Sequence, residues 1–159
     1  MKKNILLGIS FGLTSGIITT LGLIIGLNSS THSKLVVIGG IFTIAIADAF
    51  SDALGVHISE EAENIHSEKE IWISTGSTLF SKFIFSITFV LPVLLLDLSR
   101  AIPVSIAWGY IALGLLSYFI AKKQSKRPSS VICEHLSIAT AVILLTHFLG
   151  LWISKHFGI

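Results

Sequence analysis

Charged residues and cysteine are both scarce in this sequence. Asp, Glu, Lys and Arg make up 13% of its 159 residues, whereas soluble domains average about 25%. Cys133 is the single cysteine, which excludes an intrachain disulfide and a cysteine-rich metal site. The net charge of +2 comes from lysines that flank apolar stretches, so it gives no basis for nucleic acid binding. The composition therefore argues against a soluble domain and against a nucleic acid partner.

What the sequence has instead is long apolar stretches. Residues of the types AVILMFWYC make up 52% of the chain, and the mean hydropathy is +0.85. A helix of about 20 apolar residues crosses the hydrocarbon core of a lipid bilayer, and several stretches reach or approach that length. We therefore predict an all-α integral membrane protein, a single domain built as a bundle of five transmembrane helices. The predicted helices cover residues 5–27, 35–58, 77–96, 103–121 and 131–154.

Two of these helices begin with a specific local signal. The first apolar run continues from Ile5 to Leu27 with no A-x-A-type cleavage site after it, so we expect an uncleaved helix rather than a signal peptide. Pro103 is expected in the first turn of the fourth helix, where a missing N–H is tolerated.

The distribution of lysine and arginine predicts the orientation. With the N-terminus in the cytoplasm, three of the eleven Lys and Arg residues fall outside, at Lys34, Arg100 and Lys155. The short acidic segment 59–72 then faces the cytoplasm, and the short loops fit a plasma membrane. We therefore expect a multi-pass protein of the cell membrane with a cytoplasmic N-terminus. The residues counted as cytoplasmic are Lys2, Lys3, Lys69, Lys82, Lys122, Lys123, Lys126 and Arg127.

Three glycines on the first predicted helix form a groove. Gly8, Gly12 and Gly16 are spaced four residues apart, so they line one face and let another helix approach closely. The partner could be a helix of the same chain. Three glycines in register also favour self-association, and we expect a homodimer whose seam runs through the first helix.

Two aspartates lie inside the second predicted helix. Asp48 and Asp52 are four residues apart and share a helix face, in the cytoplasmic half of the span. Charged side chains there are costly and usually face a cavity and a partner. Two neighbouring acids raise each other's proton affinity, and a divalent cation that binds them releases protons. The pair is therefore a candidate intramembrane cation site; the alternative is two protonated acids hydrogen-bonded to neighbouring helices.

A run of acidic residues and histidine follows the second helix. Oxygen and imidazole ligands suit Fe²⁺, Mn²⁺ and Zn²⁺, and an acidic mouth concentrates cations beside a pore. Charge runs are usually solvated loops, and that alternative stays open. Glu134 could instead favour a helix N-terminal dipole, and His147 could relay protons or bond a neighbouring helix. The candidate metal ligands are Asp48, Asp52, His57, Glu60, Glu61, Glu63, His66, Glu68, Glu70 and Glu134.

Three segments resemble the vacuolar iron transporter (VIT) family. Residues 12–16 read Gly-Leu-Thr-Ser-Gly, similar to the family's G-L-T-D-G motif. Residues 49–59 resemble its second-helix A-I-S-M-G-L-G-E-Y-L-S motif, and residues 89–92 resemble its third-helix A-L-L-P. The similarity is best over residues 8–66 and extends to the rest of the chain as helix count and order.

The resemblance implies five helices per subunit, a homodimer, and a cation path between the first two helices of both subunits. It implies that Fe²⁺ or Mn²⁺ leaves the cytoplasm in exchange for protons, and that glutamates after the second helix gather the metal. The expected pathway residues are Asp48, Asp52, Ser15, Thr14 and His147.

The sequence departs from the family pattern at three places. The family's helix-1 aspartate is Ser15 here, its helix-2 methionine is Asp52, and segment 59–72 is too short for its large cytoplasmic metal-binding region. We therefore expect the negative charge of the pathway on the second helix. All-oxygen coordination would then favour harder cations such as Mn²⁺.

Two other kinds of function stay open. A membrane-embedded metalloenzyme would need a compact ligand set such as H-E-x-x-H, which the sequence lacks. A membrane metal sensor or partner protein would bind metal at the acidic segment without moving it. The sequence therefore predicts a transporter rather than an enzyme, with a divalent metal as its substrate and no tightly bound cofactor.

Overall fold

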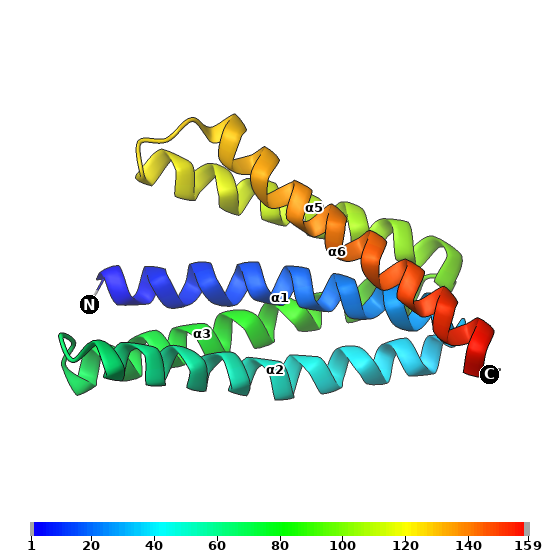
Figure 1. The fold of residues 1–159 in the computed structure, drawn as a ribbon, viewed down its shortest axis with the longest axis horizontal. Coiled ribbons are helices and arrows are strands. Elements are labelled where there is room, and N and C mark those ends of the chain that lie inside the picture. Colours follow the sequence, from blue (N-terminus) through cyan, green and yellow to red (C-terminus); the bar gives the residue numbers. More distant parts are fainter. Residues whose placement is uncertain (1, 158–159) are drawn as a thin grey trace.

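All the regular structure in the computed structural model, which describes residues 2–157, is helical (Figure 1). Helices α3 and α4 are separated only at Phe89 and together form one span. Over the described residues, five spans are long and apolar enough to cross a membrane. This confirms the predicted all-α fold with five transmembrane helices. The helices are α1 Lys2–Thr31, α2 Lys34–Glu63, α3 Glu68–Thr88, α4 Val90–Leu95, α5 Leu98–Lys123 and α6 Pro128–Phe157.

The helices extend beyond the predicted apolar stretches, because polar residues at their ends continue the same hydrogen-bonding pattern. The second helix begins at Lys34, where the Ser33 side chain caps the N-terminus, and it ends before Asn64, which adopts a left-handed conformation with φ of 51°. The prediction of a separate acidic segment at 59–72 is therefore wrong. Its two ends are helical, since glutamate is a good helix former, and only residues 64–67 form the turn.

Two prolines shape the later helices. Pro92 has no N–H to donate to the carbonyl four residues earlier, and its ring crowds that carbonyl, so the third span is interrupted at Phe89. Pro103 lies inside α5 and not in its first turn as predicted, because α5 already begins at Leu98 after Asp97. A membrane helix tolerates one such proline, since neighbouring groups satisfy the freed carbonyl.

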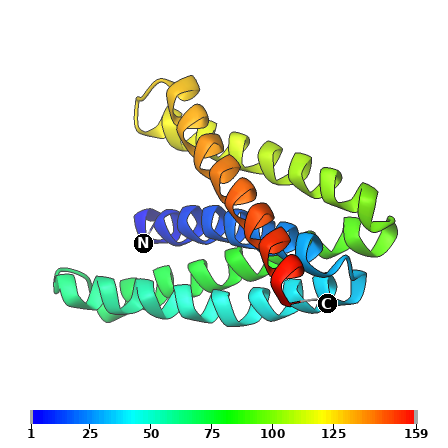
Figure 2. The same cartoon turned by 45° about the vertical axis from the view of Figure 1, so that its right-hand side comes forward.

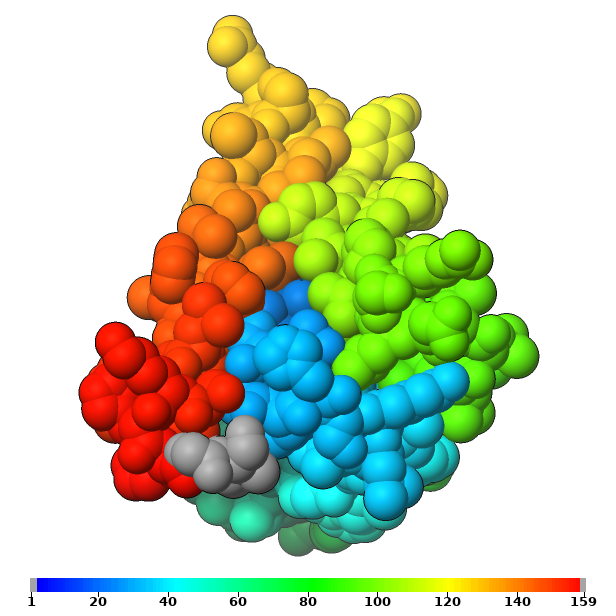
Figure 3. Space-filling model, turned by 90° about the vertical axis from the view of Figure 1, so that its right-hand side faces the viewer, coloured from blue at the N-terminus to red at the C-terminus, as the bar shows by residue number. Residues whose placement is uncertain are grey.

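Helix α1 runs through the middle of the bundle and contacts α2, α3, α5 and α6. Helices α2 and α3 lie on one side of it, and the α5–α6 hairpin lies on the other (Figure 1). The hairpin diverges from α1 toward its own connecting loop (Figure 2). At the opposite end, the α1–α2 connection lies between the end of α6 and the start of α5 (Figure 3). The arrangement makes α1 the common partner of both helix pairs.

The apolar core occupies the half of the bundle where α1 turns into α2. Ile24, Val37, Phe89, Val93 and Leu113 are fully buried there and belong to one cluster. In the other half, the interface between α1, α2 and α3 buries polar side chains instead. The candidate functional site lies in this polar half.

Candidate functional site

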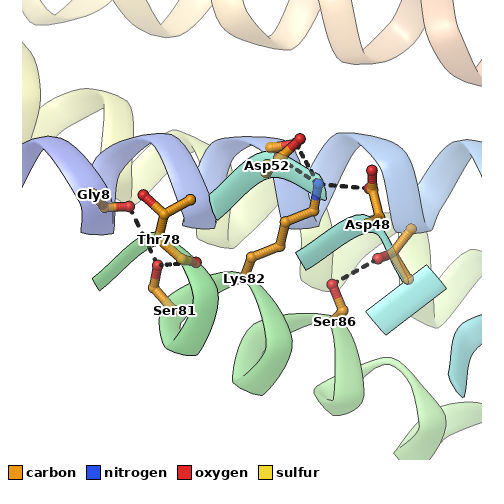
Figure 4. A network of polar contacts seen from close by, with 9 residues as sticks. Gly8, Asp48, Asp52, Thr78, Ser81, Lys82 and Ser86 are labelled. Atoms are coloured by element: carbon orange, nitrogen blue, oxygen red, sulfur yellow. Dashed lines mark hydrogen bonds and ion pairs between the residues drawn. The ribbon is translucent and has the colours of Figure 1, made fainter. Parts of the chain in front are cut away.

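A lysine lies between the two aspartates of α2 (Figure 4). The Lys82 Nζ atom is 2.5 Å from Asp52 Oδ2 and 2.6 Å from Asp48 Oδ2. It also donates a hydrogen bond to Ser15 Oγ at 2.9 Å. The contact with Asp52 is a hydrogen-bonded ion pair, whereas the contact with Asp48 is an ion pair without hydrogen-bond geometry. One ammonium group from α3 therefore joins α1 and α2.

This charged cluster is largely shielded from solvent. The Lys82 side chain is 0% exposed, and those of Asp52 and Asp48 are 20% and 27% exposed. A buried ion needs opposite charge and hydrogen-bond acceptors around it, which the two carboxylates and Ser15 supply. From the sequence we expected protons to relieve the repulsion between the aspartates. In the structure, a built-in ammonium does so and leaves a net charge of −1 when both carboxylates are ionised.

The antiparallel packing of α2 and α3 brings the side chains of Asp48, Asp52 and Lys82 to the same position along the helix axes. Asp48 and Asp52 are one turn apart on α2, and Lys82 lies on the buried face of α3. Counting Lys82 among the cytoplasmic lysines was therefore wrong, because it lies inside the third span. The sequence did hold a signal for it, since a lysine deep in an apolar span almost always has a functional partner.

The glycines of α1 pack against α3 of the same chain. A Cβ atom on Gly8 would lie 2.5 Å from the Ser74 carbonyl oxygen, and one on Gly12 would lie 2.6 Å from the Thr78 carbonyl oxygen. A Cβ atom on Gly16 would also meet α3. The stripe is thus occupied within the chain, which corrects the prediction that it forms a dimer seam. Its role is to let the polar face of α3 approach the α1 backbone.

A groove between α1 and α2 reaches one of the aspartates. Its volume is about 720 Å³, and most of its lining is apolar. Its polar lining residues are Thr19, Thr43, Asp48 and Ser51. The Thr19 hydroxyl is buried and has no hydrogen-bond partner among the described residues. A cation in the groove would therefore meet a carboxylate and neutral oxygens without crossing the apolar core.

The acidic residues near the α2–α3 turn do not converge on one point. Glu60 is buried and accepts a hydrogen bond from Ser74. The Glu63 Oε2 atom lies 3.4 Å from His66 Nε2. The Glu70 carboxylate caps the start of α3. No three His, Cys, Asp or Glu side chains among residues 2–157 are grouped to hold a metal ion. The predicted capture site is therefore not preformed within one chain. Exposed candidates on the helix surfaces are Glu61, Glu68 and Glu134.

Two candidate histidines bond hydroxyl groups of neighbouring helices. His57 Nδ1 lies 3.0 Å from Thr75 Oγ1, and His147 Nδ1 lies 2.7 Å from Ser29 Oγ. Ser29 is far along α1 from Ser15, about 21 Å at 1.5 Å per residue. His147 therefore lies apart from the charged cluster and connects α6 to α1. Thr14, the remaining pathway candidate, is half-buried on α1 next to Ser15.

A comparison with known families bears on the same helices. The sequence model of the VIT family matches residues 9–72, a segment that holds Ser15, Asp48 and Asp52 but ends before Lys82. Neither the curated proteins nor the solved structures include a significant match to the chain. The matched segment covers most of the first two membrane spans and the turn that follows them. It supports the resemblance seen in the motifs: over residues 9–72, this chain is similar to the VIT family.

Proposed function

We propose that the protein transports divalent metal ions, Fe²⁺ or Mn²⁺, out of the cytoplasm in exchange for protons. The observation that carries the proposal is the cluster of Asp48, Asp52 and Lys82 inside the membrane-spanning bundle. Ionisable groups in a membrane span are costly and usually mark an ion pathway. The VIT-family match covers α2, which supplies both carboxylates, and the part of α1 that supplies Ser15, and this supports a metal as the transported ion.

The ligands of the metal would be oxygen atoms. Asp48 and Asp52 supply carboxylates, Ser15 shares the Lys82 ammonium with them, and Thr19 lines the same groove as Asp48. We propose the hydroxyl of Thr14, the neighbour of Ser15 on α1, as a further neutral oxygen of the path. Such ligands suit hard cations, so we propose that Mn²⁺ is preferred over Fe²⁺. A carboxylate must lose its proton to hold a metal, and this competition for the same oxygens would couple metal movement to proton movement.

We also propose that the active form is a homodimer in the cell membrane. The groove between α1 and α2 is open on one side, and a second subunit against these helices would close it. The outer face of α2 carries exposed apolar residues, among them Phe42, Ile46 and Phe50, which suit a lipid or protein neighbour. With the N-terminus in the cytoplasm, the exposed glutamates at the α2–α3 turn would concentrate cations at the cytoplasmic mouth.

Metal uptake into proteoliposomes under an imposed pH gradient tests the proposal. The native chain should take up Mn²⁺ and Fe²⁺ in a gradient-dependent manner, and Asp48→Asn and Asp52→Asn should each abolish it. Asp97→Asn is the matched control, because it makes the same chemical change at an exposed residue outside the site, and asparagine caps a helix as well as aspartate does.

Each outcome has a distinct meaning. Full uptake by both site variants would refute the role of the aspartates. Lack of uptake by folded native protein would favour the alternative of a membrane metal sensor or partner protein, which binds metal but moves none.

A further inference from the structure

The Lys82 ammonium occupies the position in which Asp48 and Asp52 would hold a cation. It lies within 2.6 Å of one oxygen of each aspartate, and its side chain is fully buried. We infer that Lys82 is a tethered cation that competes with the transported ion for this carboxylate pair and thereby excludes monovalent cations. The inference rests on the proposed function and adds to it the residue that sets charge selectivity.

The charges of the cluster require the ammonium to leave before a divalent cation binds. Two carboxylates and one ammonium carry a net charge of −1. If a divalent cation joined them while Lys82 stayed, the buried site would become positively charged overall. The two cations would also repel each other strongly at such short range in a medium of low dielectric constant. The Lys82 ammonium and the divalent cation therefore bind the two carboxylates alternately and not at the same time.

This competition favours divalent over monovalent cations. The attraction between a cation and the same two carboxylates scales with the charge of the cation. A divalent cation gains about twice the attraction that the departing ammonium loses, and it neutralises both carboxylates. Na⁺ or K⁺ gains only about the attraction that the ammonium loses, so it gains no net attraction by displacing Lys82. Lys82 thus converts an acidic pair that would attract any cation into a site that selects for charge.

The Lys82 side chain is suited to such movement. Lysine carries its charge on a flexible four-carbon stem and binds as a point charge, and its third partner is the neutral hydroxyl of Ser15. The helices are held together by other contacts. The α3 backbone packs directly on Gly12, and Thr20 donates a hydrogen bond to Ser86 at 3.0 Å. The ammonium can therefore leave the carboxylates while α1 and α3 stay packed.

Equilibrium Mn²⁺ binding to the full chain purified in detergent tests this inference. We would compare native protein with Lys82→Met, which keeps an unbranched side chain of similar length and removes the charge. Lys123→Met is the matched control, because it removes the same charge from the exposed end of α5. Each protein is titrated with Mn²⁺ in choline chloride and in NaCl at equal ionic strength.

We expect native Mn²⁺ affinity to be the same in the two salts. In choline chloride, Lys82→Met should bind Mn²⁺ about 5- to 150-fold more tightly, the usual range of coupling between two ligands of one protein. Na⁺ should weaken Mn²⁺ binding to Lys82→Met, because the monovalent cation can now occupy the carboxylates. Lys123→Met should behave as the native chain does.

Two results would overturn the inference. In the first, Lys82→Met binds Mn²⁺ no more tightly than native protein, and its Mn²⁺ affinity is equally insensitive to Na⁺. Lys82 would then only hold α2 and α3 together. Mn²⁺ binding and uptake by native protein would in that case leave the proposed transport standing. If native protein neither binds nor transports Mn²⁺, the proposed function fails and the inference fails with it.

Lys82→Arg serves as a second variant if Lys82→Met does not fold. A guanidinium binds carboxylates through two parallel hydrogen bonds and is harder to displace than an ammonium. Mn²⁺ binding should therefore weaken, while Na⁺ stays excluded. Tighter Mn²⁺ binding by Lys82→Arg would overturn the inference.

Discussion

The close approach of α1 to α3 at Gly12 predicts that one added methyl group disturbs the whole interface. In Gly12→Ala, the new Cβ atom would lie 2.6 Å from the Thr78 carbonyl oxygen and 3.2 Å from the Lys82 backbone nitrogen. Both atoms belong to the backbone of α3 and cannot rotate away. The helices would have to separate by about 0.8 Å here to reach 3.4 Å, where ordinary van der Waals contact begins.

The expected loss of stability follows from this overlap. Extra volume in a well-packed interior costs about 1–3 kcal/mol, while alanine is favoured over glycine in a helix by up to about 1 kcal/mol. Gly39→Ala is the matched control on α2, because no atom of another described helix lies within 4 Å of its Cβ position. Gly12→Ala should therefore unfold at a lower temperature in detergent than Gly39→Ala, by about 2–4 °C for each kcal/mol.

The same variant separates the two possible roles of the glycine stripe. Because Gly12 packs on α3 of its own chain, Gly12→Ala should lower the unfolding temperature without changing the oligomeric state on size-exclusion chromatography. A variant as stable as Gly39→Ala, or one whose only defect is dissociation of an oligomer, would refute the packing argued here.

Three further predictions concern the charged cluster and its surroundings. Changing both Asp48 and Asp52 to Asn leaves the Lys82 ammonium buried without counter-charge, which should cost about 3–5 kcal/mol in thermal unfolding; a double variant as stable as either single variant would contradict this. Asp52→Met replaces a carboxylate with a soft sulfur ligand, so total metal uptake should fall and the uptake that remains should shift from Mn²⁺ toward Fe²⁺. Full transport with an unchanged preference would be the opposing result. His147→Ala removes the hydrogen bond to Ser29 and should lower the free energy of unfolding by about 0.6 kcal/mol, at most about 1.7 kcal/mol. Mn²⁺ uptake should be unchanged, and a loss of uptake would mean that His147 belongs to the transport pathway.

The sequence alone determined the fold class and identified the two aspartates of the candidate site. Apolar stretches of spanning length must become helices in a bilayer, because a helix satisfies its own backbone hydrogen bonds where water is absent. The four-residue spacing of Asp48 and Asp52 placed both carboxylates on one helix face. The helix ends were less well predicted, because residues such as Lys34 and Glu63 continue a helix without adding to its apolar signal.

Tertiary structure decided which helix faces meet, and with them the character of the site. Periodicity shows that Gly8 and Gly12 share a face, but only the packing shows that α3 fills that face. The same packing turns Glu60 inward, where Ser74 donates to it, and brings Lys82 between the two aspartates. These contacts join residues far apart in the chain. Helical spacing fixes the neighbours of a residue on its own helix, but it does not specify the facing helix.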